Sequence, residues 1–164
     1  MDRVLPTVVI LAIVALVFVG LALGWRARRR RQADLPALEA PPATLGAPVL
    51  ESDGFYVATT LADAPTDRVA VHGLGFRARA GITVVPEGVV LALAGRLDAF
   101  IPRASIAGVG RATWTIDRVV DRDGLVFVRW ALGATLVDSY LRTADPDALV
   151  RALATLVPDP KEAG

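Results

Sequence analysis

The sequence contains no cysteine, one histidine and one lysine. The absence of cysteine excludes disulfide bonds, thiolate zinc sites and cysteine nucleophiles, and it agrees with a reducing compartment. His72 alone cannot form a multi-histidine metal site, and Lys161 lies at the far C-terminal end, away from any Walker-type phosphate loop or Schiff-base site. The sequence therefore predicts no metal, no cofactor and no catalytic residues.

Positive charge is scarce outside the N-terminal part of the chain. Residues 1–31 hold six of the 18 Lys and Arg residues but only one of the 17 Asp and Glu residues. The 12 basic and 16 acidic side chains that remain give residues 32–164 a net charge of −4. Nucleic-acid binding requires a basic patch on the binding domain, so nucleic acid is excluded as a partner class.

Charge is absent altogether from residues 4–24, where Thr7 is the one polar side chain. As a helix, these 21 residues reach about 30 Å, the thickness of the hydrocarbon core of a bilayer. A cleaved signal peptide has a shorter apolar region and a small-residue cleavage site, and a buried core helix is rarely apolar all round. The pattern predicts a transmembrane helix.

A basic collar, residues 25–31, follows this span at once. It carries Arg26, Arg28, Arg29, Arg30 and Arg31, whereas Arg3 before the span is offset by Asp2. Cytoplasmic flanks carry the excess of Lys and Arg, so residues 1–3 are expected outside and the rest in the cytoplasm, on a bacterial inner membrane. The arginines are expected to contact lipid headgroups, and Trp25 is expected to anchor at the interface.

Gly20 and Gly24 form a GxxxG pair inside the span. This spacing allows two helices to approach closely, so homodimerisation through these glycines is one hypothesis. A lone GxxxG in a segment rich in small residues also occurs without pairing.

Residues 32–48 are rich in Pro and Ala and contain no aromatic residue, a composition typical of a spacer. A folded domain is expected from 49 to 158 and a loose tail from 159 to 164. Within the domain, β-forming residues and turn signals predict about seven short strands near 55–61, 73–85, 89–93, 97–101, 106–115 running on into 113–120, 125–132 and 135–142. Loops are expected at 62–67 and, as an Asp-Gly hairpin turn, at 121–124.

The period changes near the C-terminus. Asp145 is a suitable N-cap, Pro146 suits the first helical position, and Leu149, Leu153 and Leu156 recur at helical spacing. The chain therefore predicts a mainly β fold, an antiparallel sandwich or partly open barrel closed by one amphipathic helix.

This order of elements resembles pleckstrin-homology-like (PH-like) domains, and more closely small actinobacterial membrane proteins with one N-terminal span. The resemblance rests on residues 55–60 (FYVATT), 67–69 (DRV), 72–78 (HGLGFRA), 101–102 (IP), 130–133 (WALG) and 138–142 (DSYLR). It implies the fold and the topology but no activity. It also implies that Thr59, Thr60 and Arg68 fix a loop by hydrogen bonds.

Arg77 and Arg79 are the candidate ligand-binding residues of the domain. They alternate with Leu74, Phe76 and Ala78, which predicts a half-buried strand with both arginines facing solvent. PH domains that bind inositol phosphates use a basic pair on early strands, so the pair is either a ligand or lipid contact or simply solvated charge.

Other polar groups suggest structural roles. Asp67 and His72 offer a base and an acid, but no nucleophile with a spaced partner accompanies them. Asp138 and Arg142 are expected to pair within the fold, and Trp114 and Trp130 to be core or rim aromatics. The leading hypothesis is a membrane-anchored, non-catalytic binding module that presents its domain to a protein partner at the inner membrane face. The alternative is a domain that binds anionic lipid or a small ligand.

Overall fold

The computed structural model describes residues 4–112, 114–115, 118–119 and 124–157. It divides into two compact units, Met1–Asp34 and Leu35–Gly164. The first is built on helix α1, Val4–Arg31, which contains a segment of mean hydropathy 3.0 and is long and apolar enough to cross a membrane. The helix includes the predicted span and continues through the collar, because arginine is a good helix former and favours helix C-termini.

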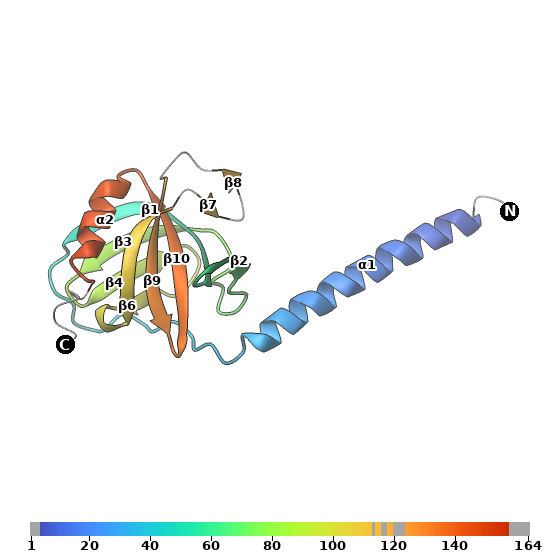
Figure 1. Cartoon of the computed structure of the whole chain (residues 1–164), viewed down its shortest axis with the longest axis horizontal. Helices are drawn as coiled ribbons and strands as arrows, with labels where there is room; N and C mark the ends of the chain where they lie inside the picture. Colours follow the sequence, from blue (N-terminus) through green and yellow to red (C-terminus); the bar gives the residue numbers. More distant parts are fainter. Residues whose placement is uncertain (1–3, 113, 116–117, 120–123, 158–164) are drawn as a thin grey trace. The chain divides into compact units, whose positions relative to one another are not determined.

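The second unit is an antiparallel sheet with one helix packed on it (Figure 1). The strands of the sheet follow the order β5-β4-β3-β1-β10-β9-β6, with β2 paired to β1. Their bounds are β1 Leu50–Leu61, β2 Ala64–Arg68, β3 Ala78–Val85, β4 Gly88–Leu93, β5 Ala99–Pro102, β6 Ile106–Ala112, β9 Leu125–Leu132 and β10 Thr135–Thr143. A separate pair, β7 Trp114–Thr115 and β8 Arg118–Val119, and a 3-10 turn, η1 Arg103–Ser105, complete the domain together with helix α2, Pro146–Ala154. The predicted mainly β fold with a C-terminal helix is confirmed.

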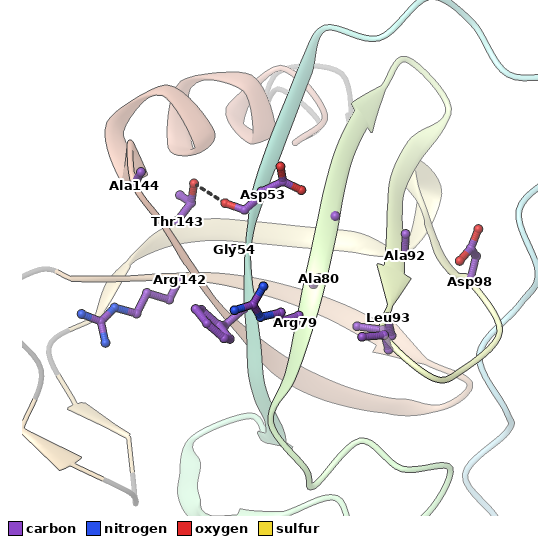
Figure 2. A pocket seen from close by; sticks show the side chains of 13 residues that line it. Asp53, Gly54, Arg79, Ala80, Ala92, Leu93, Asp98, Arg142, Thr143 and Ala144 are labelled. Carbon is purple, nitrogen blue, oxygen red and sulfur yellow. Dashed lines mark hydrogen bonds between the residues drawn. The ribbon is translucent and has the colours of Figure 1, made fainter.

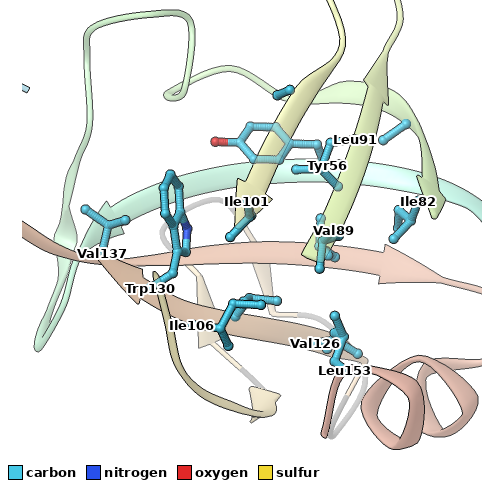
Figure 3. Close-up of a cluster of buried hydrophobic side chains, with 14 of the residues drawn as sticks. Tyr56, Ile82, Val89, Leu91, Ile101, Ile106, Val126, Trp130, Val137 and Leu153 are labelled. Carbon is cyan, nitrogen blue, oxygen red and sulfur yellow. The ribbon is translucent and has the colours of Figure 1, made fainter. Parts of the chain in front are cut away.

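The core forms between the inward face of this sheet and α2 (Figure 3). Ile82, Val89 and Val126 are each fully buried, and the residue two positions further along each strand is buried too, which is the period of two expected of strands. Leu153 from α2 is also fully buried. As predicted, Asp145 caps α2, where its Oδ1 accepts a hydrogen bond of 2.9 Å from the backbone N–H of Ala148.

Several element boundaries differ from the prediction. β1 begins at Leu50 rather than near 55, although residues 51–54 are Glu, Ser, Asp and Gly. Pairing with β3 on one side and, from Gly54 onward, with β10 on the other overrides the weak local propensity. The expected loop at 62–67 contains β2. The expected hairpin turn at 121–124 and the tail at 159–164 fall largely or wholly outside the described residues.

The expected spacer, residues 32–48, is also different in the structure. Leu35 is 7% exposed and belongs to the core, and the Glu39 carbonyl accepts a 2.9 Å hydrogen bond from Phe100 N–H at the edge of β5. Further on, Gly46 N–H donates to Glu87 Oε2 at 3.0 Å. The compact domain thus begins at Leu35, and the segment covers the β5 edge, a common protection against edge-to-edge pairing. Composition alone does not predict that this segment docks on the domain, because one buried leucine and a few hydrogen bonds are enough to hold a Pro-rich segment in place.

Candidate functional site

Phe55, in β1, is the centre of the candidate site. In the sheet register it stands opposite Arg142 of β10 on one side and Arg79 of β3 on the other. Residues directly opposite on neighbouring strands share a face, so one half-buried aromatic ring is flanked by two exposed arginines. Because Tyr56, the next residue, is buried in the core, this face is the outer one.

Arg77 adds a third guanidinium to this face from a different kind of element. Its Cζ lies 4.3 Å from the centre of the Phe55 ring, which is a cation–π contact. The prediction that Arg77 lies on a strand is wrong: β3 starts at Ala78, and residues 72–76 form turns in which His72 and Gly73 have φ of 52° and 74°. Phe76, expected on the buried side, is accordingly 53% exposed. We call Arg77, Arg79 and Arg142 around Phe55 the arginine face.

The arginine face borders an open hollow of about 1100 Å³ (Figure 2). Arg79 and Arg142 line it together with two carboxylates, Asp53 and Asp98. Gly54 lies in its wall, where a Cβ would stand 2.1 Å from the carbonyl oxygen of Arg142, so only glycine permits this close approach of β1 and β10. Among the described residues, no carboxylate forms an ion pair with the three arginines.

A buried chain of hydroxyl groups fixes the loop that carries Arg77. The Tyr56 hydroxyl lies 2.6 Å from Thr59 Oγ1 and donates to the carbonyl of Leu74 at 2.7 Å. Thr59 Oγ1 in turn lies 2.6 Å from Ser139 Oγ, which accepts a 2.9 Å bond from Trp130 Nε1. Burial raises the pKa of the Tyr56 hydroxyl well above its ordinary value, although the hydrogen bond with Thr59 acts in the opposite direction. The expected role of Thr59 in fixing a loop is confirmed.

The predicted pairing of Asp138 with Arg142 is wrong. Asp138 receives two hydrogen bonds from Arg129, at 2.8 Å from Nε and 2.9 Å from Nη2, and Arg129 Nη2 also donates to Asp63 Oδ1 at 3.0 Å. The hydrogen bond with Asp138 raises the pKa of the Arg129 guanidinium. Asp138 and Arg142 lie four residues apart on the same strand, and the cross-strand partner of Asp138 is Arg129. Arg142 is consequently left for the arginine face.

The other candidates are dispersed. His72 Nε2 lies 2.7 Å from the carbonyl oxygen of Leu35, so this ring holds the start of the domain. Arg68 Nη1 donates to the Gly75 carbonyl at 3.4 Å, a long bond within the loop. Trp130 is a core residue, whereas the side chain of Trp114 falls outside the described part of the chain. No cluster of three or more potential metal ligands occurs among the described residues.

The residues expected at the membrane lie on α1. Trp25 is 45% exposed, and Cβ atoms placed on Gly20 and Gly24 would meet nothing within 4 Å, as expected on a helix whose apolar segment is not buried against the rest of the described chain. The described collar residues Arg26, Arg28, Arg29 and Arg30 belong to the same helix. Their roles toward lipid, and those of Arg31, remain predictions.

Sequence reasoning found Arg77 and Arg79 but missed Phe55 and Arg142. By its local sequence Phe55 is only a strand former, and the pattern around Arg142 predicts a pair with Asp138. The register of three strands joins residues 55, 79 and 142 across the sheet, and no local pattern in the sequence contains that information.

Comparison with known proteins agrees with this fold. Residues 35–156 match the family model described as "Bacterial PH domain-like". The comparison with curated proteins found no match. A chain in a solved structure titled "The 8S snRNP Assembly Intermediate" is similar at a TM-score of 0.47 and 11% identity, over 75% of this chain and 91% of that chain. That likeness supports no conclusion about function. The family model covers most of the chain, and the protein belongs to the bacterial PH domain-like family.

Proposed function

We propose that this protein is a single-pass, membrane-anchored and non-catalytic binding module. Its α1 helix spans the inner membrane with the N-terminus outside, and its PH-like domain lies on the cytoplasmic side, where the arginine face holds an acidic segment of a protein partner. The anchor is supported by an apolar helix with a mean hydropathy of 3.0 and the orientation by the collar arginines. PH-like domains are generally binding modules, which supports the absence of catalysis.

The observation that carries the ligand class is the grouping of Arg77, Arg79 and Arg142 around one ring. Three exposed guanidinium groups on one face have no carboxylate partner within the described residues, in a region whose overall charge is negative. Guanidinium groups bind carboxylates in a bidentate manner, and arginine and aromatic residues dominate the energetics of protein interfaces. The face is therefore suited to an acidic ligand.

The shape of the site favours a protein segment over an enclosed small molecule. The hollow beside the arginines is open, and Arg79 and Arg142 stand exposed on the sheet rather than inside a cavity. Small-molecule sites usually bury most of the ligand surface. Anchoring raises the local concentration of the domain, so a modest interface is sufficient for a partner at the same membrane.

The test compares two variants that remove the same charge from the full-length protein in its own membranes. Arg79→Gln/Arg142→Gln alters the arginine face, and Arg103→Gln/Arg151→Gln removes two exposed arginines elsewhere. We expect crosslinking and affinity purification to recover a stoichiometric acidic protein with the wild type and the control variant but not with the first variant. A partner retained by the arginine-face variant would contradict the proposal. Crosslinks to anionic lipid in place of any protein, lost in the same variant, would establish the lipid alternative.

The membrane segment carries two subsidiary proposals. The collar arginines, Arg26 and Arg28 to Arg31, bind anionic headgroups at roughly 1 kcal/mol each, and Trp25 lies at the interface. Two copies pair through Gly20 and Gly24, whose spacing of four residues allows two helices to approach closely. Gly20→Ile/Gly24→Ile should abolish crosslinked dimers in detergent, and dimers that survive this change would exclude that interface.

A further inference from the structure

The outer face of the sheet carries a second row of residues beside the arginine face. The strand register places Asp53 of β1 opposite Gly81 of β3, and Gly81 opposite Ala92 of β4. We call these three residues the Asp53 row. Phe55 and Arg79 stand two residues away along β1 and β3, so the two rows share one face and lie about 6.6 Å apart. A row with a carboxylate and two small residues therefore runs beside a basic row.

The Asp53 row lines the open hollow that borders the arginine face (Figure 2). Gly81 has no side chain, and a Cβ placed there would make an ordinary 3.5 Å contact with the Cβ of Ala92. The strands do not separate at this point, because β3 and β4 stay paired on both sides of it. The hollow is therefore deep because its floor consists of small residues, and it has room for side chains that reach down onto the sheet.

Carboxylates stand beside this floor. Asp53 and Asp98, in the β4–β5 loop, both line the hollow and are both exposed. Among the residues that the structure describes, neither of them forms an ion pair, although Arg79 and Arg142 line the same hollow. A uniformly acidic ligand on the two arginines would bring further negative charge close to these carboxylates, which is unfavourable. The hollow thus favours negative charge at one row and disfavours it at the next.

An extended peptide has the period that these two rows require. Successive side chains of a strand alternate between its faces, so residues i and i+2 point the same way and lie about 6.6–6.8 Å apart. The two rows of the sheet have the same separation, because they too are two residues apart on each strand. A segment that lies along β1 and β3 therefore places residue i over the arginines and residue i+2 over the Asp53 row.

We propose that the partner segment held by the arginine face is extended and bipolar. An acidic side chain of this segment binds Arg79 and Arg142, and a basic side chain two positions away reaches into the hollow toward Asp53 and Asp98. The inference rests on the proposed function, because it takes the arginine face as the binding site, and it adds the charge pattern of the partner. The two carboxylates then determine specificity, since they favour alternating charge and disfavour a uniformly acidic segment.

The test uses two synthetic peptides and the full-length protein in nanodiscs of phosphatidylcholine, a lipid without net charge. The peptides have equal length and the same β-forming Val and Thr residues, but one carries Glu-Val-Lys at its centre and the other Glu-Val-Glu. We expect the wild type to bind the Glu-Val-Lys peptide about fivefold more tightly, which corresponds to one or two exposed charge interactions. The collar arginines attract the more acidic peptide, so background binding acts against this expectation.

Two charge variants separate this inference from the proposed function. Asp53→Asn/Asp98→Asn should abolish the preference for Glu-Val-Lys, and Arg79→Gln/Arg142→Gln should weaken the binding of both peptides. A wild type that prefers Glu-Val-Glu, with binding lost in the arginine variant, would overturn the bipolar pattern and leave the proposed function intact. Binding of both peptides that is unchanged in the arginine variant, or no binding of either to the wild type, would refute the arginine face as a peptide site and this inference with it.

A third variant tests whether the segment enters the hollow. Ala92→Leu adds a side chain to the floor, and Ala131→Leu adds the same side chain to an exposed position of β9 outside the hollow. Both positions are exposed, so thermal unfolding should change little in either variant. We expect Ala92→Leu to weaken binding of the Glu-Val-Lys peptide several-fold and Ala131→Leu to leave it unchanged. Equal affinities of the two variants for this peptide would overturn the inference.

Discussion

At the scale of single residues, Gly54 permits the arginine face to form. A Cβ at this position would lie 2.1 Å from the backbone oxygen of Arg142, which cannot move without disturbing the β1–β10 ladder. Gly54→Ala should therefore reduce the free energy of unfolding by about 1–3 kcal/mol, the range for overpacked sites. Gly81→Ala is the matched control, because its Cβ would make an ordinary 3.5 Å contact with Ala92. Thermal unfolding, monitored by circular dichroism, measures the stability of both variants, and equal melting temperatures would contradict the prediction.

The two tyrosines provide a test of burial at the same scale. Burial raises the pKa of Tyr56 and of Tyr140, and an unfolded tyrosine ionises near pH 10. A group whose pKa is higher in the folded state contributes stability that is complete below the unfolded pKa and is lost as the pH rises above it. We expect the protein to lose stability progressively above about pH 10, with phenolate absorbance appearing only as the fold is lost. Phenolate formation near pH 10 with the far-ultraviolet spectrum intact would show that the tyrosines are accessible.

At the scale of elements, one side chain, Arg129, connects β9, β10 and the β1–β2 turn. Asp138 accepts two of its bonds and has a side chain only 8% exposed, whereas Asp63, which accepts the third, is 81% exposed. Asp138→Asn should lower the free energy of unfolding by about 1–2 kcal/mol, since it removes a buried, charge-assisted pair. Asp63→Asn should cost at most about 0.5 kcal/mol, because exposed pairs contribute little and Asn tolerates the positive φ of 61° at this position. Chemical denaturation measures the free energy of unfolding of the two variants, and an equal decrease in both would refute this ranking.

These elements also show how far the sequence alone could lead. The helices and most strands were predictable because their signals are local: the capping Asp145, the spacing of Leu149 and Leu153, and the absence of charge in α1. The start of β1 and the docked segment after Leu35 were not, because pairing with distant strands decides them. The site divides in the same way. Arg77 and Arg79 were visible as a local basic pair, whereas Arg142 and Phe55 join them only through the strand register.

At the scale of the whole molecule, charge asymmetry around α1 should decide which side of the membrane holds the domain. Five arginines follow the apolar span, and Arg3 beside Asp2 precedes it, so translocating the short N-terminus costs far less than translocating the collar. Single cysteines at Asp2 and at Ala134 can report this in intact cells, because the chain has no other thiol. Any outer membrane is permeabilised first, and a membrane-impermeant maleimide is then added. It should label Asp2→Cys before lysis and Ala134→Cys only after lysis.

The collar can be tested as the cause of this orientation. Replacing its five arginines with Gln, and adding three Arg residues before Val4, reverses the charge bias without changing the apolar span or the domain. We expect a substantial fraction of this variant to expose Ala134→Cys to the maleimide, because the Lys/Arg bias and not the length of the span sets the direction of insertion. A variant that keeps the original labelling pattern would show that the folded domain, rather than the collar, fixes the topology. In that case the collar would serve lipid contact alone.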